Sequence, residues 1–169
     1  MRVELFVPAT GTTELRSVAA AAFGDSPDAD VSEWFSFDEM TAVISRGRGI
    51  CVQACDATGL VLGFIYAQQE NPINGKEGTE KWMVVILAVD PGVAGTGIGT
   101  VLLHEIERRA ADSGAVKMFV YTNQGDDAVV GFYHKNGYMD AGWVQDYQNG
   151  QENSAVFLLK YLGGAEQRM

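Results

Sequence analysis

The 169 residues are the length of one domain with one hydrophobic core, so we expect residues 1–169 to form a single domain. Apolar residues make up 47% of the chain and charged residues 20%, the balance of a globular protein rather than a disordered one. Acidic residues outnumber basic ones by 22 to 12, and the net charge of −10 repels phosphate backbones, which argues against nucleic acid as a partner.

The chain begins without the pattern of a secretory signal, because the single Arg2 is not followed by an apolar run. Val3–Val7 alternates apolar and polar residues and predicts a strand. Thr12 or Thr13 can cap a helix over Glu14–Phe23. The next expected elements are a helical region at Val31–Ser45, a hairpin of strands Ile50–Ala54 and Leu60–Gln68, and a polar loop at Asn71–Thr79.

Trp82–Val89 is nearly all apolar, which predicts a central strand covered on both faces. It is the longest apolar run and is too short to cross a bilayer, so we expect a cytoplasmic protein without membrane contact. The later expected elements are a helix from the glycine-rich turn to Asp112 with a buried stripe of Ile98, Val101, Leu102, Ile106 and Ala110, a strand at Val116–Tyr121, a short helix capped by Asp126 or Asp127, and strands Tyr138–Val144 and Ala155–Tyr161.

The expected order of elements is therefore β-αα-βββ-α-β-α-ββ, an α/β fold with a mixed sheet of about seven strands and helices on both faces. Cys51 and Cys55 are the only cysteines and lie too far apart on one strand for a disulfide. No histidine accompanies them, so they make no zinc site. His104 and His134 are isolated on helices, and we expect both to be exposed and no metal to be bound.

Glycines at 92, 95, 97 and 99 follow the apolar strand and lead directly into an amphipathic helix. Such a turn brings unpaired helix N–H groups to an anion without β-carbons in the way. A P-loop is excluded because Ile98 stands where it needs lysine. A dinucleotide fingerprint fits poorly, because Thr100 stands at its third glycine and no acidic residue follows about twenty positions later.

The segment Val89-Asp90-Pro91-Gly92-Val93-Ala94-Gly95-Thr96-Gly97-Ile98-Gly99 resembles the acyl-coenzyme A motif of the GNAT superfamily of N-acetyltransferases. It departs from the usual pattern at Ala94, where the family most often has arginine or glutamine. A second match is Phe132-Tyr133-His134-Lys135-Asn136-Gly137-Tyr138, similar to the family's helix ending in Tyr-Glu-Lys-x-Gly-Phe. The resemblance extends from about Gly49 onward and agrees with the expected order of elements.

The resemblance implies direct transfer of an acetyl group from acetyl-coenzyme A to a primary amine in a ternary complex. In the family, backbone groups near the end of the central strand bind the pantetheine arm, and turn amides bind the diphosphate. A residue at the start of the next helix also contacts the cofactor; Asp126 stands at that position, with Asn123 as a displaced alternative. The implied cofactor-binding residues are Leu87, Ala88 and Val89, then Ala94, Gly95, Thr96, Gly97, Ile98, Gly99 and Thr100, then Asn123, Asp126 and Tyr133.

Tyr133 stands at the family's tyrosine position, which implies a general acid for the departing thiolate, although a packing role is the alternative. The general base is open: Glu80 lies beside the family's position, and Glu33, Asp38 and Glu39 are alternatives. Trp34, Phe35 and Phe37 lie where the family forms its acceptor wall, although such an aromatic stripe also suits the core. Tyr66 and Tyr147 are further candidates for lining the acceptor cleft.

The sequence does not identify the acceptor. A small-molecule amine, a peptide or protein N-terminus and a lysine side chain all remain candidates, and a non-catalytic acyl-coenzyme A-binding regulator is a further alternative. A homodimer through the last strands is frequent in similar proteins.

Overall fold

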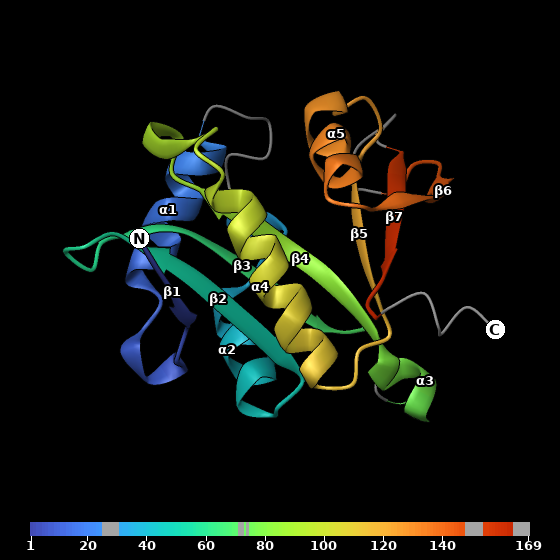
Figure 1. Ribbon diagram of the computed structural model, residues 1–169, viewed down its shortest axis with the longest axis horizontal. Coiled ribbons are helices and arrows are strands. Elements are labelled where there is room, and N and C mark those ends of the chain that lie inside the picture. Colours follow the sequence, from blue (N-terminus) through green and yellow to red (C-terminus); the bar gives the residue numbers. More distant parts are fainter. Residues whose placement is uncertain (25–30, 71–72, 74, 148–153, 164–169) are drawn as a thin grey trace.

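The computed structural model describes residues 1–24, 31–70, 73, 75–147 and 154–163. These residues form one seven-stranded sheet in the order β1-β2-β3-β4-β5-β7-β6, with helices on both faces (Figure 1). Among the described strands, β4 and β5 form the only parallel pair. The strands are β1 (Arg2–Leu5), β2 (Gly49–Cys55), β3 (Val61–Gln69), β4 (Lys81–Val89), β5 (Lys117–Asn123), β6 (Met139–Val144) and β7 (Ala155–Tyr161). The helices are α1 (Thr13–Phe23), α2 (Phe37–Ser45), α3 (Gly75–Glu80), α4 (Ile98–Asp112) and α5 (Asp127–Lys135), with 3-10 turns at Pro8–Thr10, Val31–Glu33 and Pro91–Val93.

The mixed sheet and its hairpin confirm the expected α/β fold. In the hairpin turn, Asp56 Oδ1 accepts hydrogen bonds from the backbone N–H groups of Thr58 and Leu60, at 2.7 and 3.0 Å. Gly59 adopts a φ of +94°, which few other residues tolerate. Local turn chemistry therefore sets the β2–β3 connection.

Two expectations for the first half were wrong. Val31–Ser45 is not one helical region, because Ser36 has extended backbone and interrupts it. The Ser36 hydroxyl accepts a hydrogen bond from the Glu39 N–H at 3.1 Å and so begins α2 at the next residue.

The expected loop at Asn71–Thr79 contains a helix, α3, and residues 71, 72 and 74 lie outside the described part of the chain. Two ion pairs, each between residues four positions apart, stabilise this helix: Lys76 with Glu80 at 3.3 Å and Glu77 with Lys81 at 2.8 Å.

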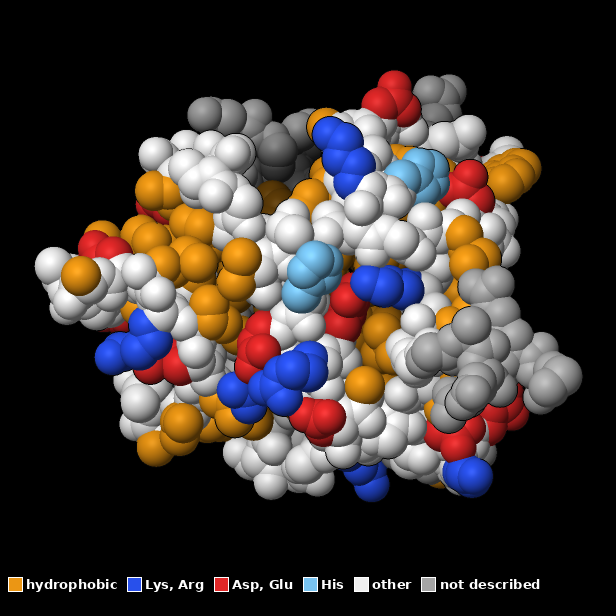
Figure 2. Space-filling model, in the orientation of Figure 1, with side chains coloured by type: hydrophobic (Ala, Val, Ile, Leu, Met, Phe, Trp, Pro, Cys, Tyr) orange, Lys and Arg blue, Asp and Glu red, His pale blue; other side chains and the backbone are white. Residues whose placement is uncertain are grey.

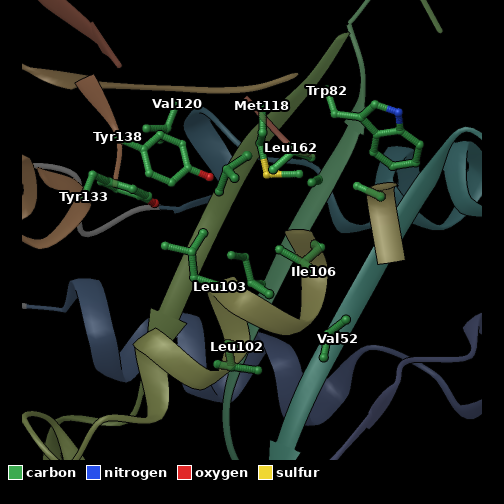
Figure 3. Packing of buried hydrophobic residues seen from close by; sticks show 14 of the residues in the cluster. Val52, Trp82, Leu102, Leu103, Ile106, Met118, Val120, Tyr133, Tyr138 and Leu162 are labelled. Atoms are coloured by element: carbon green, nitrogen blue, oxygen red, sulfur yellow. The ribbon is translucent and has the colours of Figure 1, made fainter. Parts of the chain in front are cut away.

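Two hydrophobic clusters lie on opposite faces of the sheet. The first, called here the α4 cluster, includes Trp82, Leu102, Leu103, Ile106 and Met118 (Figure 3). The second, the α1 cluster, lies beneath α1 and α2 and includes Leu15, Met40, Phe35, Phe64 and Tyr66. One residue of the expected α4 stripe was wrong: Val101 is 40% exposed, and Leu103 occupies the buried position instead.

Strand β4 is interrupted by a bulge near its middle. Tyr66 pairs with Ile86 but Ala67 pairs with Val84, so Val85 has no partner of its own on β3. The extra residue reverses the facing of the side chains. Trp82 and Val84 pack in the α4 cluster, whereas Ile86 and Ala88 pack in the α1 cluster.

Strands β4 and β5 pair over only three residues, Lys81–Met83 with 117–119. Beyond Met83 the two strands diverge (Figure 1). Within the described residues, Val84–Val89 therefore has no strand partner on its β5 side. We call this wedge between β4 and β5 the splay.

Burial raises the pKa of several cysteine and tyrosine side chains in the core, and this affects the stability of the fold at alkaline pH. It raises the pKa of Cys51 and Cys55, and also that of Tyr66, Tyr133 and Tyr138. Unfolding releases these groups to ordinary values of about 8.5 for cysteine and 10 for tyrosine. The unfolded chain therefore loses these protons first, so the free energy of unfolding should fall as pH rises above about 8.5.

Denaturant titrations from pH 7 to 10.5 would measure this decline. In a Cys51→Ala, Cys55→Ala double variant, only the tyrosines remain, so the decline should begin near pH 10 instead. Equal stability at pH 7.5 and 10.5 in the wild-type protein would contradict the prediction.

Candidate active site

The turn between β4 and α4 is shaped by its own hydrogen bonds. Asp90 Oδ1 accepts from the Gly92 N–H at 2.7 Å, and the Val93 carbonyl accepts from the Thr96 hydroxyl at 2.6 Å. Gly95 and Gly97 have φ values of +78° and +90°. These positive φ angles explain why glycine stands at both positions.

The same turn leaves a group of backbone donors without acceptors. The first hydrogen bond of α4 runs from the Val101 N–H to the Gly97 carbonyl at 3.1 Å. Ala94 and Thr96 donate within the turn, to Pro91 and Val93, each at 3.4 Å. Within this turn and the first turn of α4, the N–H groups for which the described residues offer no acceptor are those of Gly95, Gly97, Ile98, Gly99 and Thr100.

These donors lie at the positive end of the helix dipole, where a diphosphate is stabilised. The residues present therefore fit the diphosphate of coenzyme A, and five of the seven predicted turn positions still offer their amides. Ala94 and Thr96 are the two whose amides already donate within the turn.

The edge of β4 that lacks a strand partner leads directly into this turn. On its β3 side the strand is paired, with Leu87 opposite Ile65, Ala88 opposite Phe64 and Val89 opposite Gly63. On the side of the splay, alternate backbone groups of 84–89 are free to pair with an extended arm. A pantetheine arm can bind there like an added strand.

Tyr133 lies on α5 and is only 4% exposed. Its ring packs edge-on against those of Phe132 and Tyr138, at centroid distances of 5.1 and 5.2 Å. Figure 3 shows Tyr133 and Tyr138 entering the α4 cluster from the same side. Burial, and then the carboxylate of Glu107, raise the pKa of Tyr133, so the phenol is protonated at neutral pH and can donate.

The two candidate polar residues near α5 have different environments. Asp126 is the N-cap of α5, as predicted, and its Oδ1 accepts from the Val129 N–H at 3.2 Å. Asn123 ends β5, and its Oδ1 is buried without a hydrogen-bond partner in the described residues. Asn123 therefore has side-chain capacity left for a ligand, whereas the Asp126 carboxylate is committed to the helix cap.

Glu80 lies at the opposite end of β4 from the turn. Its carbonyl accepts from the Val116 N–H at 2.8 Å, beside the paired end of β4 and β5, and its carboxylate is 3.3 Å from Lys76. The nine residues of β4 separate it from the turn by about 30 Å at 3.3 Å per residue. Two of the alternative bases are also ion-paired: Asp38 with Arg16 at 3.2 Å, and Glu39 with Arg46 at 3.8 Å.

The residues expected to form the acceptor wall differ in their exposure to solvent. Phe35 and Tyr66 are buried in the α1 cluster, where their rings lie 6.0 Å apart, so neither lines an open surface, contrary to expectation. The Tyr66 hydroxyl donates to Gln68 Oε1 at 2.6 Å. Phe35 lies between the 3-10 turn and α2, and its ring packs edge-on against that of Phe37 at 4.9 Å. Trp34 and Tyr147 are exposed.

Tyr147 belongs to an aromatic group that sequence reasoning missed. It contacts Tyr121 and Phe157 at ring distances of 5.2 and 5.3 Å. Tyr121 and Phe157 are opposite one another on β5 and β7 and face away from the α4 cluster. The period-two alternation of Val116–Tyr121 was the signal that could have found Tyr121.

Both histidines are exposed, as the pale blue side chains of Figure 2 show. His134 Nε2 lies 2.8 Å from Asp140 Oδ1. No group of three or more histidine, cysteine, aspartate or glutamate residues that could hold a metal occurs in the described residues. Among those residues, no helix has the length and apolarity needed to cross a membrane.

Known structures share this architecture along almost the whole chain. An aminoglycoside 6'-N-acetyltransferase complexed with coenzyme A has a TM-score of 0.74 at 19% identity, covering 97% of this chain and 98% of that one. The aminoglycoside 6'-N-acetyltransferase from Enterococcus faecium has a TM-score of 0.73 at 20% identity, covering 97% and 98%. The ribosomal-protein-S18-alanine N-acetyltransferase from Escherichia coli has a TM-score of 0.71 at 13% identity, covering 99% and 97%.

At such low identity these likenesses establish the fold, and comparison with curated proteins gives no match. The model of the acetyltransferase (GNAT) family matches residues 12–138, well over half of the chain. That match contains both the glycine turn and Tyr133. The chain therefore belongs to the GNAT family of acetyltransferases, enzymes that take their acyl group from acetyl-coenzyme A.

Proposed function

We propose that this protein transfers the acetyl group of acetyl-coenzyme A to a primary amine by direct transfer in a ternary complex. The observation that carries the proposal is the continuity between the unpaired edge of β4 and the turn with its five amides that lack an acceptor. Together they offer one track for an extended arm that ends in a diphosphate. The bound thioester supplies an activated acyl group.

Each part of the track has a separate task. Amides of Gly95 and of 97–100 hold the diphosphate, and backbone groups of Leu87, Ala88 and Val89 orient the arm along β4. Holding both reactants in one geometry removes most of the ordering cost of a bimolecular reaction. The Val85 bulge lies in the β3–β4 pairing, within the stretch of β4 that borders the splay, and it redirects the side chains of β4 from one face of the sheet to the other.

Tyr133 Oη holds the proton that the departing sulfur requires. Its raised pKa keeps that proton in place until a strong base develops next to it. The base that deprotonates the incoming ammonium stays open among Glu80, Glu33, Asp38 and Glu39, acting directly or through water.

The acceptor enters, in this proposal, from the face that carries α1 and α2. Trp34 belongs to that face, and Tyr121 and Tyr147 lie on the same side of the sheet, away from the α4 cluster. Aromatic faces attract cationic amines, and the net charge of −10 adds a favourable field for them.

The test is incubation with acetyl-coenzyme A and two acceptor panels, with thiol release and mass spectrometry as readouts. One panel holds small amines, including aminoglycosides; the other holds peptides with free N-termini and lysines. A mass gain of one acetyl group on a small amine supports the proposal, and a gain only on peptides supports protein acetylation. Binding of coenzyme A without transfer to any acceptor would indicate a non-catalytic regulator, and absence of binding would overturn the proposal.

A further inference from the structure

A partly buried ion pair lies between α4 and β7. Glu107 is one of only two polar or charged residues in the described chain that are buried, with an exposed fraction of 7%. Its Oε2 accepts from Lys160 Nζ at 2.7 Å. Lys160 is opposite Met118 in the β5–β7 pairing, so it faces the α4 cluster. A carboxylate withdrawn from water in this way is costly unless its remaining lone pairs are satisfied.

Two further polar atoms at this place are buried without a hydrogen-bond partner in the described residues: Glu107 Oε1 and the hydroxyl of Tyr138. One is an acceptor and the other a donor, and Lys160 Nζ lies 5.7 Å from the centre of the Tyr138 ring. Buried polar groups are rarely left unpaired, because each orphan costs free energy. A hydrogen bond from Tyr138 to Glu107, direct or through one enclosed water, satisfies both.

The three residues belong to different halves of the molecule. Glu107 is on α4, which packs on β2, β3 and β4. Tyr138 follows α5, and Lys160 is on β7, both on the far side of the splay. In the described residues, β4 and β5 pair over only three residues, so the strand ladder joins the halves at one end alone. The cluster of Glu107, Lys160 and Tyr138 is called here the tie.

We propose that Glu107 is a positioning residue: with Lys160 and the Tyr138 hydroxyl, it holds α5 against α4 and so holds Tyr133 at the splay. This proposal rests on the proposed function, because Tyr133 matters there as the proton donor. Tyr133 packs on Tyr138 at 5.2 Å, so a shift of Tyr138 displaces Tyr133 directly.

The position of α5 also bears on the turn. A β-carbon added at Gly99 would lie 3.5 Å from the Phe132 ring, which shows how closely α5 approaches the first turn of α4. The tie lies two turns further along α4, at Glu107. Loss of the tie should therefore misplace Tyr133 more than it disturbs the amides of Gly95 and 97–100.

The experiment compares Glu107→Ala, Glu107→Gln and Tyr138→Phe with the wild-type protein. Glu105→Ala is the matched control, because Glu105 is a carboxylate of the same helix paired only with Arg108 and Arg109. Hydrogen–deuterium exchange of 127–135 reports the order of α5 without any need for activity. Acetyl transfer gives kcat and the KM for acetyl-coenzyme A.

Glu107→Ala and Tyr138→Phe should speed exchange in α5 at least about tenfold. They should lower kcat by about 10- to 100-fold, the effect of a displacement of about 1 Å, with little change in KM. Glu107→Gln should recover part of both losses, since its amide can still bond Lys160 and Tyr138. Glu105→Ala should behave as the wild type.

Tyr138→Phe retains the ring and removes one oxygen, so it serves even if Glu107→Ala does not fold. Wild-type exchange and wild-type kcat in Tyr138→Phe would overturn the tie. If the wild-type protein acetylates no amine, the proposed function fails, and hydrogen–deuterium exchange in α5 alone tests the tie. Faster exchange in Tyr138→Phe and Glu107→Ala, but not in Glu105→Ala, supports the tie. Unchanged exchange in all three variants overturns it.

Discussion

Replacing Tyr133 by phenylalanine should lower kcat for acetyl transfer by about 10²- to 10⁴-fold, the contribution of a positioned general acid. The ring and its edge-on packing against Phe132 and Tyr138 remain, so only the proton donor is lost. Coenzyme A binding measured by calorimetry should be unchanged, because the diphosphate donors lie on the turn before α4.

A matched control is Tyr161→Phe, which removes a hydroxyl from an exposed residue at the end of β7. Its kcat should equal that of the wild-type protein. The pH profile gives a second check. Burial and Glu107 raise the pKa of Tyr133, so in the wild-type protein deprotonation of Tyr133 should not lower kcat below about pH 10. A Tyr133→Phe variant with undiminished kcat would assign Tyr133 to packing alone.

Gly97→Asp should weaken coenzyme A binding at least about a hundredfold, or roughly 2.7 kcal/mol. Gly97 precedes the unengaged amides of α4, so a carboxylate there faces the bound diphosphate and cancels the favourable field of the helix end. A β-carbon at Gly97 meets no atom within 4 Å, so no steric clash opposes the variant before ligand binds.

The conformational strain of this variant needs its own control, because Gly97 has a φ of +90°. Gly114 follows the other end of α4 with a φ of +95°, and a β-carbon there also has nothing within 4 Å. Gly114→Asp therefore carries a similar strain without a charge at the turn. Calorimetry should show normal binding for Gly114→Asp, and equal losses in both variants would mean that strain, not the anion site, controls affinity.

Some features could be predicted from the sequence because they depend on a few neighbouring residues. The turn at Asp56–Gly59 and the cap at Asp126 each use hydrogen bonds that span no more than four positions. Two local signals were available and missed. Ser36 followed by Glu39 is a capping signature that predicts where α2 begins, and the four-residue spacing of Lys76 from Glu80 favours α3.

Other features depend on packing between distant segments. The apolar run Trp82–Val89 predicts a central strand covered on both faces, but it does not reveal that the strand changes face at Val85, where its register against β3 shifts. The sequence makes Phe35 and Tyr66 candidates for the acceptor wall, and only the close approach of their rings in the α1 cluster shows that both belong to the core.

By itself, the sequence determined the order of the strands and of the helices other than α3, the glycine turn before α4 and membership of an acyl-coenzyme A-dependent family, because hydrophobic period, turn residues and motif spacing are short-range properties. The tertiary structure alone decided that β4 and β5 part after Met83, that the edge of β4 runs into five unengaged amides, and that Glu107 meets Lys160. Glu107 and Lys160 are 53 residues apart in the chain, so only the closing of β7 against β5 brings their charges together.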